Sequence, residues 1–158
     1  MKEVLMLVGI PGSGKSTWVK NHIDPDVLKK AAHISADSIR KEFYGDENIQ
    51  GNGQRVFEAV FQRFETALNN PHVETIIIDN TSVAYKTRKD YYKIIKDSGV
   101  ECKIKLVVFN NFEQAKKWNK ERSRVVPDDV MDRMISRFQM PPTPEEKQIP
   151  NLEVIKGS

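Results

Sequence analysis

The sequence predicts an α/β fold of three layers, in which helices cover both faces of a central parallel sheet of four or five strands. Two observations lead to this prediction. Short runs of apolar and β-branched residues alternate along the chain with longer segments of helical periodicity, and these runs are almost continuously apolar. Such strands are typical of a parallel sheet that is buried on both faces. The runs lie at residues 4–8, 32–35, 75–79 and 104–109, with a possible fifth at 152–155.

Length and composition indicate a single domain at residues 1–158. The chain has 25 basic and 22 acidic residues, for a net charge of +3, so local patches must attract any polyanion. A lone cysteine, Cys102, excludes a disulfide framework and favours a reducing compartment. The sequence shows neither a signal peptide nor a run of membrane-spanning length, so we expect a cytoplasmic protein that does not bind a membrane.

Helices are predicted between the strands. Apolar residues at three- and four-residue steps predict an amphipathic helix at 54–68, whose aromatic stripe belongs to the core. A helix that begins near Tyr85 should end at a glycine cap, Gly99. A basic helix over 112–122 and a second helix with Pro127 at its first position would form a lid at about 112–138. A loop rich in Gly and Asn is expected at 44–53, and a stiff connector or tail at 141–158.

The clearest functional motif is the sequence Gly-Ile-Pro-Gly-Ser-Gly-Lys-Ser-Thr at residues 9–17, between the first strand and a helix start. Its spacing of Gly, four residues, Gly, Lys and Ser bends the backbone so that several N–H groups point at one anion. Lys15 adds a mobile cation, and the Ser16 hydroxyl suits a phosphate-bound Mg²⁺. The motif predicts a nucleoside triphosphate ligand, because a simple glycine-rich turn would explain neither this order nor the helix. The expected phosphate-binding residues are Gly12, Ser13, Gly14, Lys15, Ser16 and Thr17.

The segment after the second strand places a carboxylate and a guanidinium three residues apart. If Asp37 lies in the first turn of a helix, Arg40 shares its face at the carboxyl edge of the sheet, where ligands bind in open α/β folds. There Asp37 can accept a proton from an attacking hydroxyl, and Arg40 can hold a phosphate by two parallel hydrogen bonds. The alternative is an N-capping aspartate paired with an exposed arginine. The neighbouring phosphate motif favours the catalytic interpretation.

Two further segments carry candidate residues. Asp79 ends the third strand and could organise Mg²⁺ directly or through its waters, or it could bond nearby backbone N–H groups in a turn; the sequence favours neither. The run at 116–124 concentrates positive charge before Pro127, and an arginine of a hinged lid could neutralise charge during phosphoryl transfer. The alternative for this run is a solvated basic face.

These motifs together resemble the kinase domain of the phage-type polynucleotide 5′-hydroxyl kinase family. The resemblance covers most of the chain and rests on residues 9–18, 37–40, 79–82, 119–122 and 126–130. It implies a P-loop kinase that uses ATP and transfers the γ-phosphoryl group to the 5′-hydroxyl end of DNA or RNA. By this resemblance Asp37 is the general base, Arg40 holds the phosphate of the acceptor, and Arg122 is the lid arginine on the donor phosphates.

The chain departs from this family at two points. Thr81 and Ser82 stand where family members often have Thr-Asn, and the sequence has no room for the phosphatase domain of the bifunctional phage enzyme, so a 3′-phosphatase is not predicted. We therefore predict a kinase with Lys15, Asp37 and Arg122 as catalytic residues, Arg40 on the substrate, and Ser16 and Asp79 at Mg²⁺. A phosphotransferase for a small alcohol and a module that binds ATP without turnover remain alternatives, and the oligomeric state is left open.

Overall fold

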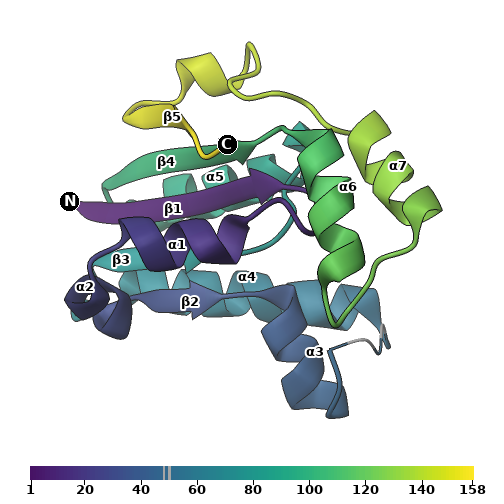
Figure 1. The fold of residues 1–158 in the computed structure, drawn as a ribbon. Coiled ribbons are helices and arrows are strands. Elements are labelled where there is room, and N and C mark those ends of the chain that lie inside the picture. The colour runs from purple at the N-terminus through teal and green to yellow at the C-terminus, as the bar shows by residue number, and fades with distance from the viewer. Residues whose placement is uncertain (48, 50) are drawn as a thin grey trace.

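The computed structural model describes residues 1–47, 49 and 51–158, so that Asn48 and Gln50 of the expected loop at 44–53 lie outside the described residues (Figure 1). The described chain forms one sheet of five strands in the order β2-β3-β1-β4-β5, and every pairing is parallel. This confirms the predicted parallel sheet, including its fifth strand. The strands are β1 (Lys2–Gly9), β2 (Ala32–Ile34), β3 (Thr75–Ile78), β4 (Cys102–Phe109) and β5 (Leu152–Lys156).

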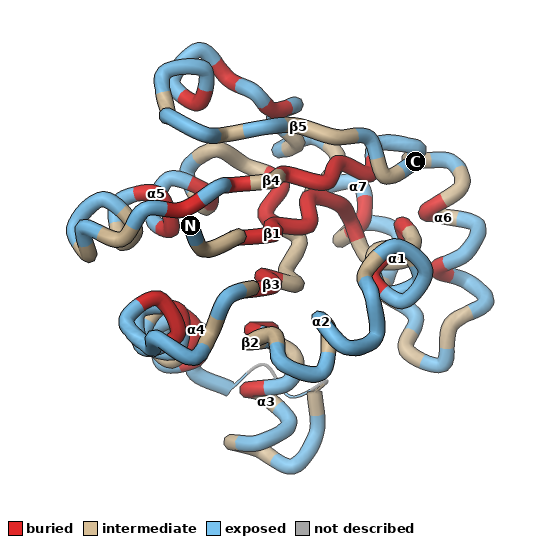
Figure 2. The backbone as a smooth tube through the Cα atoms, turned by 90° about the vertical axis from the view of Figure 1, so that its left-hand side faces the viewer, coloured by how far each residue is buried: buried red, intermediate tan, exposed pale blue. Residues whose placement is uncertain are grey.

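Helices cover both faces of the sheet, as Figure 2 shows from its edge. On β1, Val4, Met6 and Val8 point into a core shared with α4 and α5, whereas Leu5 and Leu7 point to the opposite face, where α1 packs. This alternation follows from the two-residue period of a strand, and burial of both faces explains why β1 is apolar from Val4 to Val8. The helices are α1 (Lys15–His22), α2 (Pro25–Lys30), α3 (Ala36–Tyr44), α4 (Gly53–Asn69), α5 (Tyr85–Ser98), α6 (Phe112–Glu121) and α7 (Asp128–Ser136).

The helix ends follow local capping chemistry. Asn52 caps α4 by accepting a hydrogen bond from the backbone N–H of Arg55, and α5 ends at Gly99 in the left-handed conformation, as predicted. The prediction that Pro127 is the first helical residue was wrong by one position, because Pro127 is the N-cap of α7. Its ψ of 145° is extended, which a proline ring permits, and the helix begins at Asp128.

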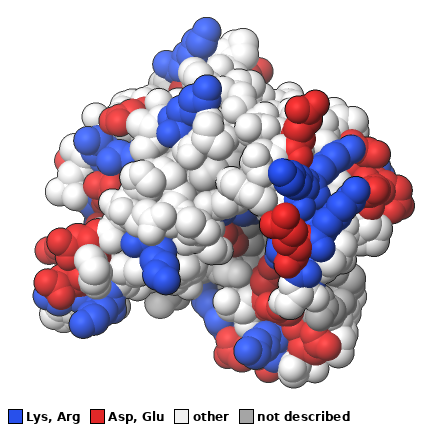
Figure 3. Space-filling model, in the orientation of Figure 1, with Lys and Arg blue, Asp and Glu red and all other residues white. Residues whose placement is uncertain are grey.

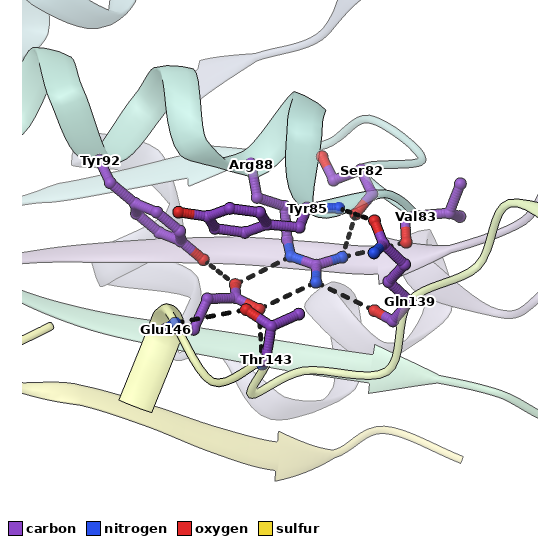
Figure 4. A network of polar contacts seen from close by, with 8 residues as sticks. All are labelled: Ser82, Val83, Tyr85, Arg88, Tyr92, Gln139, Thr143 and Glu146. Carbon is purple, nitrogen blue, oxygen red and sulfur yellow. Dashed lines mark hydrogen bonds and ion pairs between the residues drawn. The ribbon is translucent and has the colours of Figure 1, made fainter. Parts of the chain in front are cut away.

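The segment 141–158 packs against the domain through a buried ion pair as well as through β5. Arg88 and Glu146 are both fully buried, and Nε and Nη2 of Arg88 donate to the Glu146 carboxylate at 2.9 Å each (Figure 4). The Tyr92 hydroxyl donates to the same carboxylate. Burial opposes ionisation of Glu146, but these donors outweigh it and hold the pKa of the carboxyl below its usual range.

The same arginine ties this segment to the end of the lid. Nη1 of Arg88 donates to the carbonyl oxygens of Ser82 and Val83, and Nη2 also donates to that of Gln139 (Figure 4). The network therefore joins α5, the turn after β3, the residues that follow α7, and a short 3₁₀ turn at Glu146–Gln148. Within the described ranges, none of the helices has both the length and the apolar character that crossing a membrane requires.

Candidate active site

The phosphate-binding loop, residues 9–17, connects β1 to α1 at the carboxyl edge of the sheet. Gly14 is the N-cap of α1 with a φ of 93°, and Gly12 has a φ of 80°, a region that side-chain-bearing residues rarely adopt. The first turn of α1 has no side-chain cap, so its backbone N–H groups can donate hydrogen bonds to an anion. Nζ of Lys15 donates to the carbonyl oxygen of Gly9 at 2.9 Å, which holds the ammonium group against the loop.

Lys15 is the centre of the electrostatics here. Burial lowers its pKa from 10.5 to about 8, although the carboxylates of Asp79 and Asp37 act in the opposite direction. The positive charge of Arg122 lowers this pKa further. The charges of Asp37, Asp79 and Arg122 therefore all influence the pKa of the Lys15 ammonium group.

One cleft of about 1320 Å³ brings the candidate residues together. Its lining includes the phosphate loop, the start of α3, the end of β3 and the loop between α6 and α7. Every site residue predicted from the sequence lines it, namely Gly12, Ser13, Gly14, Lys15, Ser16, Thr17, Asp37, Arg40, Asp79 and Arg122. The structure thus places them in one cleft, and their individual roles stay predictions.

Asp37 and Arg40 lie on α3 as the three-residue spacing predicts. Ser35 caps the helix by accepting from the N–H of Ser38, which puts Asp37 in the first turn. Nη1 of Arg40 donates to Oδ1 of Asp37 at 3.0 Å. Nε of Arg40 is buried and has no hydrogen-bond partner among the described residues. A buried unpaired donor is costly, and an anion that enters the cleft could satisfy it.

Asn80 positions α3, although the sequence did not single it out. Its Oδ1 accepts a hydrogen bond from the N–H of Ala36 at 2.8 Å, and its Nδ2 donates to the hydroxyl of Tyr91 at 3.2 Å. Burial raises the pKa of Tyr91 to about 12, so the phenol keeps its proton. The end of β3 therefore fixes the helix that carries Asp37. The signal in the sequence was an amide directly after the strand-ending Asp79.

Asp79 faces the cleft with a partner that sequence reasoning missed. Its Oδ2 lies 3.4 Å from Nε2 of His33 on the neighbouring strand β2. Burial disfavours the carboxylate, but the hydrogen bond with His33 and the charge of Lys15 hold its pKa below the usual range. Asp79 is therefore ionised at neutral pH, as a ligand of Mg²⁺ or of its waters must be.

The residues of the cleft fit a Mg²⁺ ion whose ligands are mainly phosphate oxygens. The described chain has no cluster of three or more His, Cys, Asp or Glu side chains able to bind a metal. Mg²⁺ in phosphoryl-transfer sites needs only one or two protein ligands, because phosphate oxygens and waters supply the rest. The ionised Asp79 and the Ser16 hydroxyl, which line the same cleft, are of the right type and number.

The root of the lid rests directly on the phosphate loop. A Cβ atom on Gly12 would lie 2.7 Å from the carbonyl oxygen of Ala115 and 2.9 Å from the backbone nitrogen of Asn119, both in α6. A Cβ atom on Gly14 would lie 3.2 Å from the ring of Trp118, so this tryptophan packs against the loop. Glycine at these positions allows α6 to approach the loop this closely.

Asn119 shapes the loop that follows α6, residues 122–126. Its fully buried amide donates to the carbonyl oxygen of Val126 at 2.8 Å and accepts from the N–H of the same residue at 3.1 Å. This pair of bonds closes the segment that carries Arg122 and Arg124. Nη1 of Arg122 is buried without a hydrogen-bond partner in the described part of the chain.

The basic run at 116–124 forms a mixed surface. Figure 3 shows lysine and arginine side chains gathered over the lid with acidic side chains among them. Lys116, for example, pairs with Asp132 of α7. Arg122 and Arg124 are the cations of this run that line the cleft. Arg124, which the sequence presented only as part of the run, forms an ion pair with Asp37, with 2.9 Å between Nη1 and Oδ2.

A family model described as an AAA domain matches residues 4–141. The chain belongs to this family. Among curated proteins, an L-seryl-tRNA(Sec) kinase of Methanococcus maripaludis is 23% identical over 96% of the chain. A putative bifunctional polynucleotide phosphatase/kinase of Acanthamoeba polyphaga mimivirus is 26% identical over 77% of it, in agreement with the resemblance to polynucleotide kinases. The chain spans 58% of the length of the first relative, and the aligned part spans 24% of the second.

Solved structures confirm the P-loop kinase fold. A fungal RNA kinase superposes with a TM-score of 0.69 at 16% identity, over 99% of this chain and 75% of its own. A gluconokinase of Sinorhizobium meliloti 1021 gives 0.59 at 12% identity, over 99% and 83% of the two chains. Kti12 of Chaetomium thermophilum, in complex with ADP-AlF3, gives 0.65 at 15% identity, over 97% and 88%. At these identities the likeness concerns the fold.

Proposed function

We propose that this AAA-domain protein is an ATP-dependent kinase that transfers the γ-phosphoryl group of ATP to the 5′-hydroxyl end of DNA or RNA. The observation that carries the proposal is the placement of Asp37. Its carboxylate lies in the same cleft as the phosphate loop, with the guanidinium of Arg40 bonded beside it. A cleft with an anion cradle, a carboxylate and a phosphate-binding cation contains the groups that phosphoryl transfer to a polynucleotide end needs.

The donor side would use the phosphate loop and the lid. The N–H groups at the start of α1 and the ammonium of Lys15 would bind the phosphates, and Arg122 would bring its unpaired Nη1 to the charge that develops in the transition state. Mg²⁺, held by Ser16 and Asp79 and by the phosphates, would supply charge neutralisation. Because these groups are in place before the reaction, little reorganisation is required during it.

The acceptor side would use α3. Asp37 would accept the proton of the 5′-hydroxyl group while that oxygen bonds to the γ-phosphorus, the bond from this phosphorus to the bridging oxygen breaks, and ADP leaves. Arg40 would hold the phosphate next to the acceptor hydroxyl with two parallel hydrogen bonds. Since Arg40 and Asp37 share one face of α3, the same helix would set both the position of the acceptor and its activation.

A second candidate acceptor is a hydroxyl group that is not a polynucleotide end. The M. maripaludis relative is named as a kinase of seryl-tRNA(Sec), and it aligns with nearly the whole chain. Transfer to a small alcohol, free or attached to RNA, would use the same base and the same donor site. It would not need Arg40 to meet a phosphate.

An acceptor panel tests the proposal. The purified protein is given γ-labelled ATP and Mg²⁺ with 5′-hydroxyl DNA and RNA oligonucleotides, seryl-tRNA, nucleosides and sugars. We expect label on the oligonucleotides, and transfer to small alcohols alone would refute the polynucleotide assignment. Asp37→Asn should lower kcat by about 100-fold to 10,000-fold, the usual contribution of a general base, with unchanged ATP binding. An ATP-binding module without turnover would show no transfer to any acceptor.

A further inference from the structure

The carboxylate of Asp37 is bound by two arginines that come from opposite sides of the cleft. Nη1 of Arg40 in α3 donates to Oδ1 at 3.0 Å, and Nη1 of Arg124 in the 122–126 loop forms an ion pair with Oδ2 at 2.9 Å. In Figure 1 the connection between α6 and α7 begins at the lower end of α6, on the side where α3 lies, and rises to α7. Each oxygen of the carboxylate therefore has a guanidinium beside it, so an incoming hydroxyl must share Oδ1 or Oδ2 with an arginine.

Release of one of the two arginines would open more of the Asp37 carboxylate to an incoming hydroxyl. Arg40 is three residues along the same helix, and its side chain is only 14% exposed, so this contact is set by α3 itself. Arg124 reaches Asp37 from another element, and its position depends on the loop that Asn119 closes. A movement of this loop would open the contact, whereas Arg40 stays on the same helix as Asp37, so Arg124 is the partner that can leave.

The geometry of the loop keeps a released Arg124 in the cleft. The two hydrogen bonds between Asn119 and Val126 close this loop. Arg122 and Arg124 both line the cleft. A guanidinium that leaves a carboxylate can pair with another anion, and a phosphate can accept two parallel hydrogen bonds from it.

We propose that Arg124 is a second ligand for the phosphate of the acceptor, and that it exchanges the Asp37 carboxylate for this phosphate when the acceptor binds. The inference rests on the proposed polynucleotide kinase function and deepens it. An acceptor with an anionic phosphate beside its hydroxyl draws Arg124 away and frees Oδ2 of Asp37. An alcohol without this anion leaves the carboxylate paired on both oxygens. The exchange would therefore select polynucleotide ends over small alcohols.

The test compares two acceptors that differ only in charge. One is a 5′-hydroxyl dinucleotide with its natural phosphodiester, and the other has an uncharged methylphosphonate linkage. For wild-type protein, Arg124→Ala and Arg124→Lys, kcat and KM are measured with saturating ATP. Arg137→Ala is the matched control, because it removes a lid arginine that is exposed at the end of α7 and does not line the cleft. ATP binding and thermal unfolding of each variant verify the fold.

We expect Arg124→Ala to lower the preference for the charged dinucleotide by about tenfold to 150-fold, mainly through KM, which is the range for a lost hydrogen bond to a charged group. Arg124→Lys should restore part of this preference, and Arg137→Ala should leave it unchanged. An equal loss on both acceptors, or an unchanged preference, would overturn the inference while leaving the proposed function intact. Wild-type protein that phosphorylates neither dinucleotide would refute the proposed function, and the inference with it.

Discussion

Replacing Glu146 by alanine should destabilise the domain strongly, because it breaks the buried network of Figure 4. Arg88 would keep its charge at 0% exposure while losing two hydrogen bonds of 2.9 Å, and the Tyr92 hydroxyl would lose its acceptor. Removing one partner of a buried ion pair costs about 3–5 kcal/mol. This is a large share of the free energy of unfolding of a typical domain, which is about 5–15 kcal/mol. For a chain of this size Tm should fall by about 6–20 °C.

Urea denaturation of wild type and Glu146→Ala measures this free energy, with an unchanged dependence on urea as the sign that both unfold in the same way. Glu145→Ala is the matched control, since Glu145 is exposed one residue away, and its effect should be within about 0.5 kcal/mol. Combining Glu146→Leu with Arg88→Met should recover much of the loss, because no buried charge remains unpaired. A loss below about 1 kcal/mol for Glu146→Ala would refute this reasoning.

The network also predicts a pH dependence. The folded protein holds the pKa of Glu146 below its ordinary value of 4.5, so the unfolded chain takes up this proton first as the pH falls. The stability that the carboxylate contributes is complete above pH 4.5 and is lost as the pH falls through the lower pKa of the folded state. The difference in stability between wild type and Glu146→Ala should therefore shrink in acid, as urea titrations at several pH values would show.

Three further predictions concern the cleft. Lys15, whose pKa is about 8 in the free protein, should become protonated when phosphates bind, so ATP affinity should fall as the pH rises above about 8. Calorimetry in buffers of different ionisation enthalpy should detect proton uptake by the protein on ATP binding at about pH 9. Absence of this proton uptake would contradict the prediction. Gly12→Ala should abolish ATP binding, because its Cβ would lie 2.7 Å from an α6 carbonyl oxygen, whereas Gly45→Ala, with a similar φ of 78° and open space around it, should bind ATP normally. Asn119→Ala should cost about 1–3 kcal/mol for two lost hydrogen bonds. It should also speed hydrogen exchange at the amide of Val126, and unchanged exchange would show that Asn119 does not hold this loop.

Elements with a strong local signal were predictable from the sequence. The apolar runs at 4–8 and 104–109 correspond to β1 and β4, and the phosphate motif gives the left-handed turn at Gly14 and the start of α1. The six-residue helix α2 was missed, since it is too short to show a periodicity. Its signal was Asp24 followed by Pro25, an N-cap residue and a proline at the first helical position.

The partners of charged groups were the part that the sequence could not supply. Asp79 was singled out, but His33, which is 46 positions away in the chain, becomes its neighbour only because β2 and β3 pair in parallel. In the same way Arg124 was one cation among many in a charged run, and its contact with Asp37 depends on where the loop after α6 crosses the cleft. Spacing along one helix predicts a pair such as Asp37 and Arg40, whereas pairs between elements require the fold.

The closeness of α6 to Gly12 divides the lid into a fixed part and an adjustable part. Because the helix backbone touches the loop that would hold the donor, any rotation of α6 would deform the nucleotide cradle itself. The short segment beyond Asn119 is therefore the place where substitutions can change the acceptor preference. Randomising residues 123–126 while keeping α6 and Arg122 intact should yield enzymes with new acceptor ranges and unaltered ATP binding.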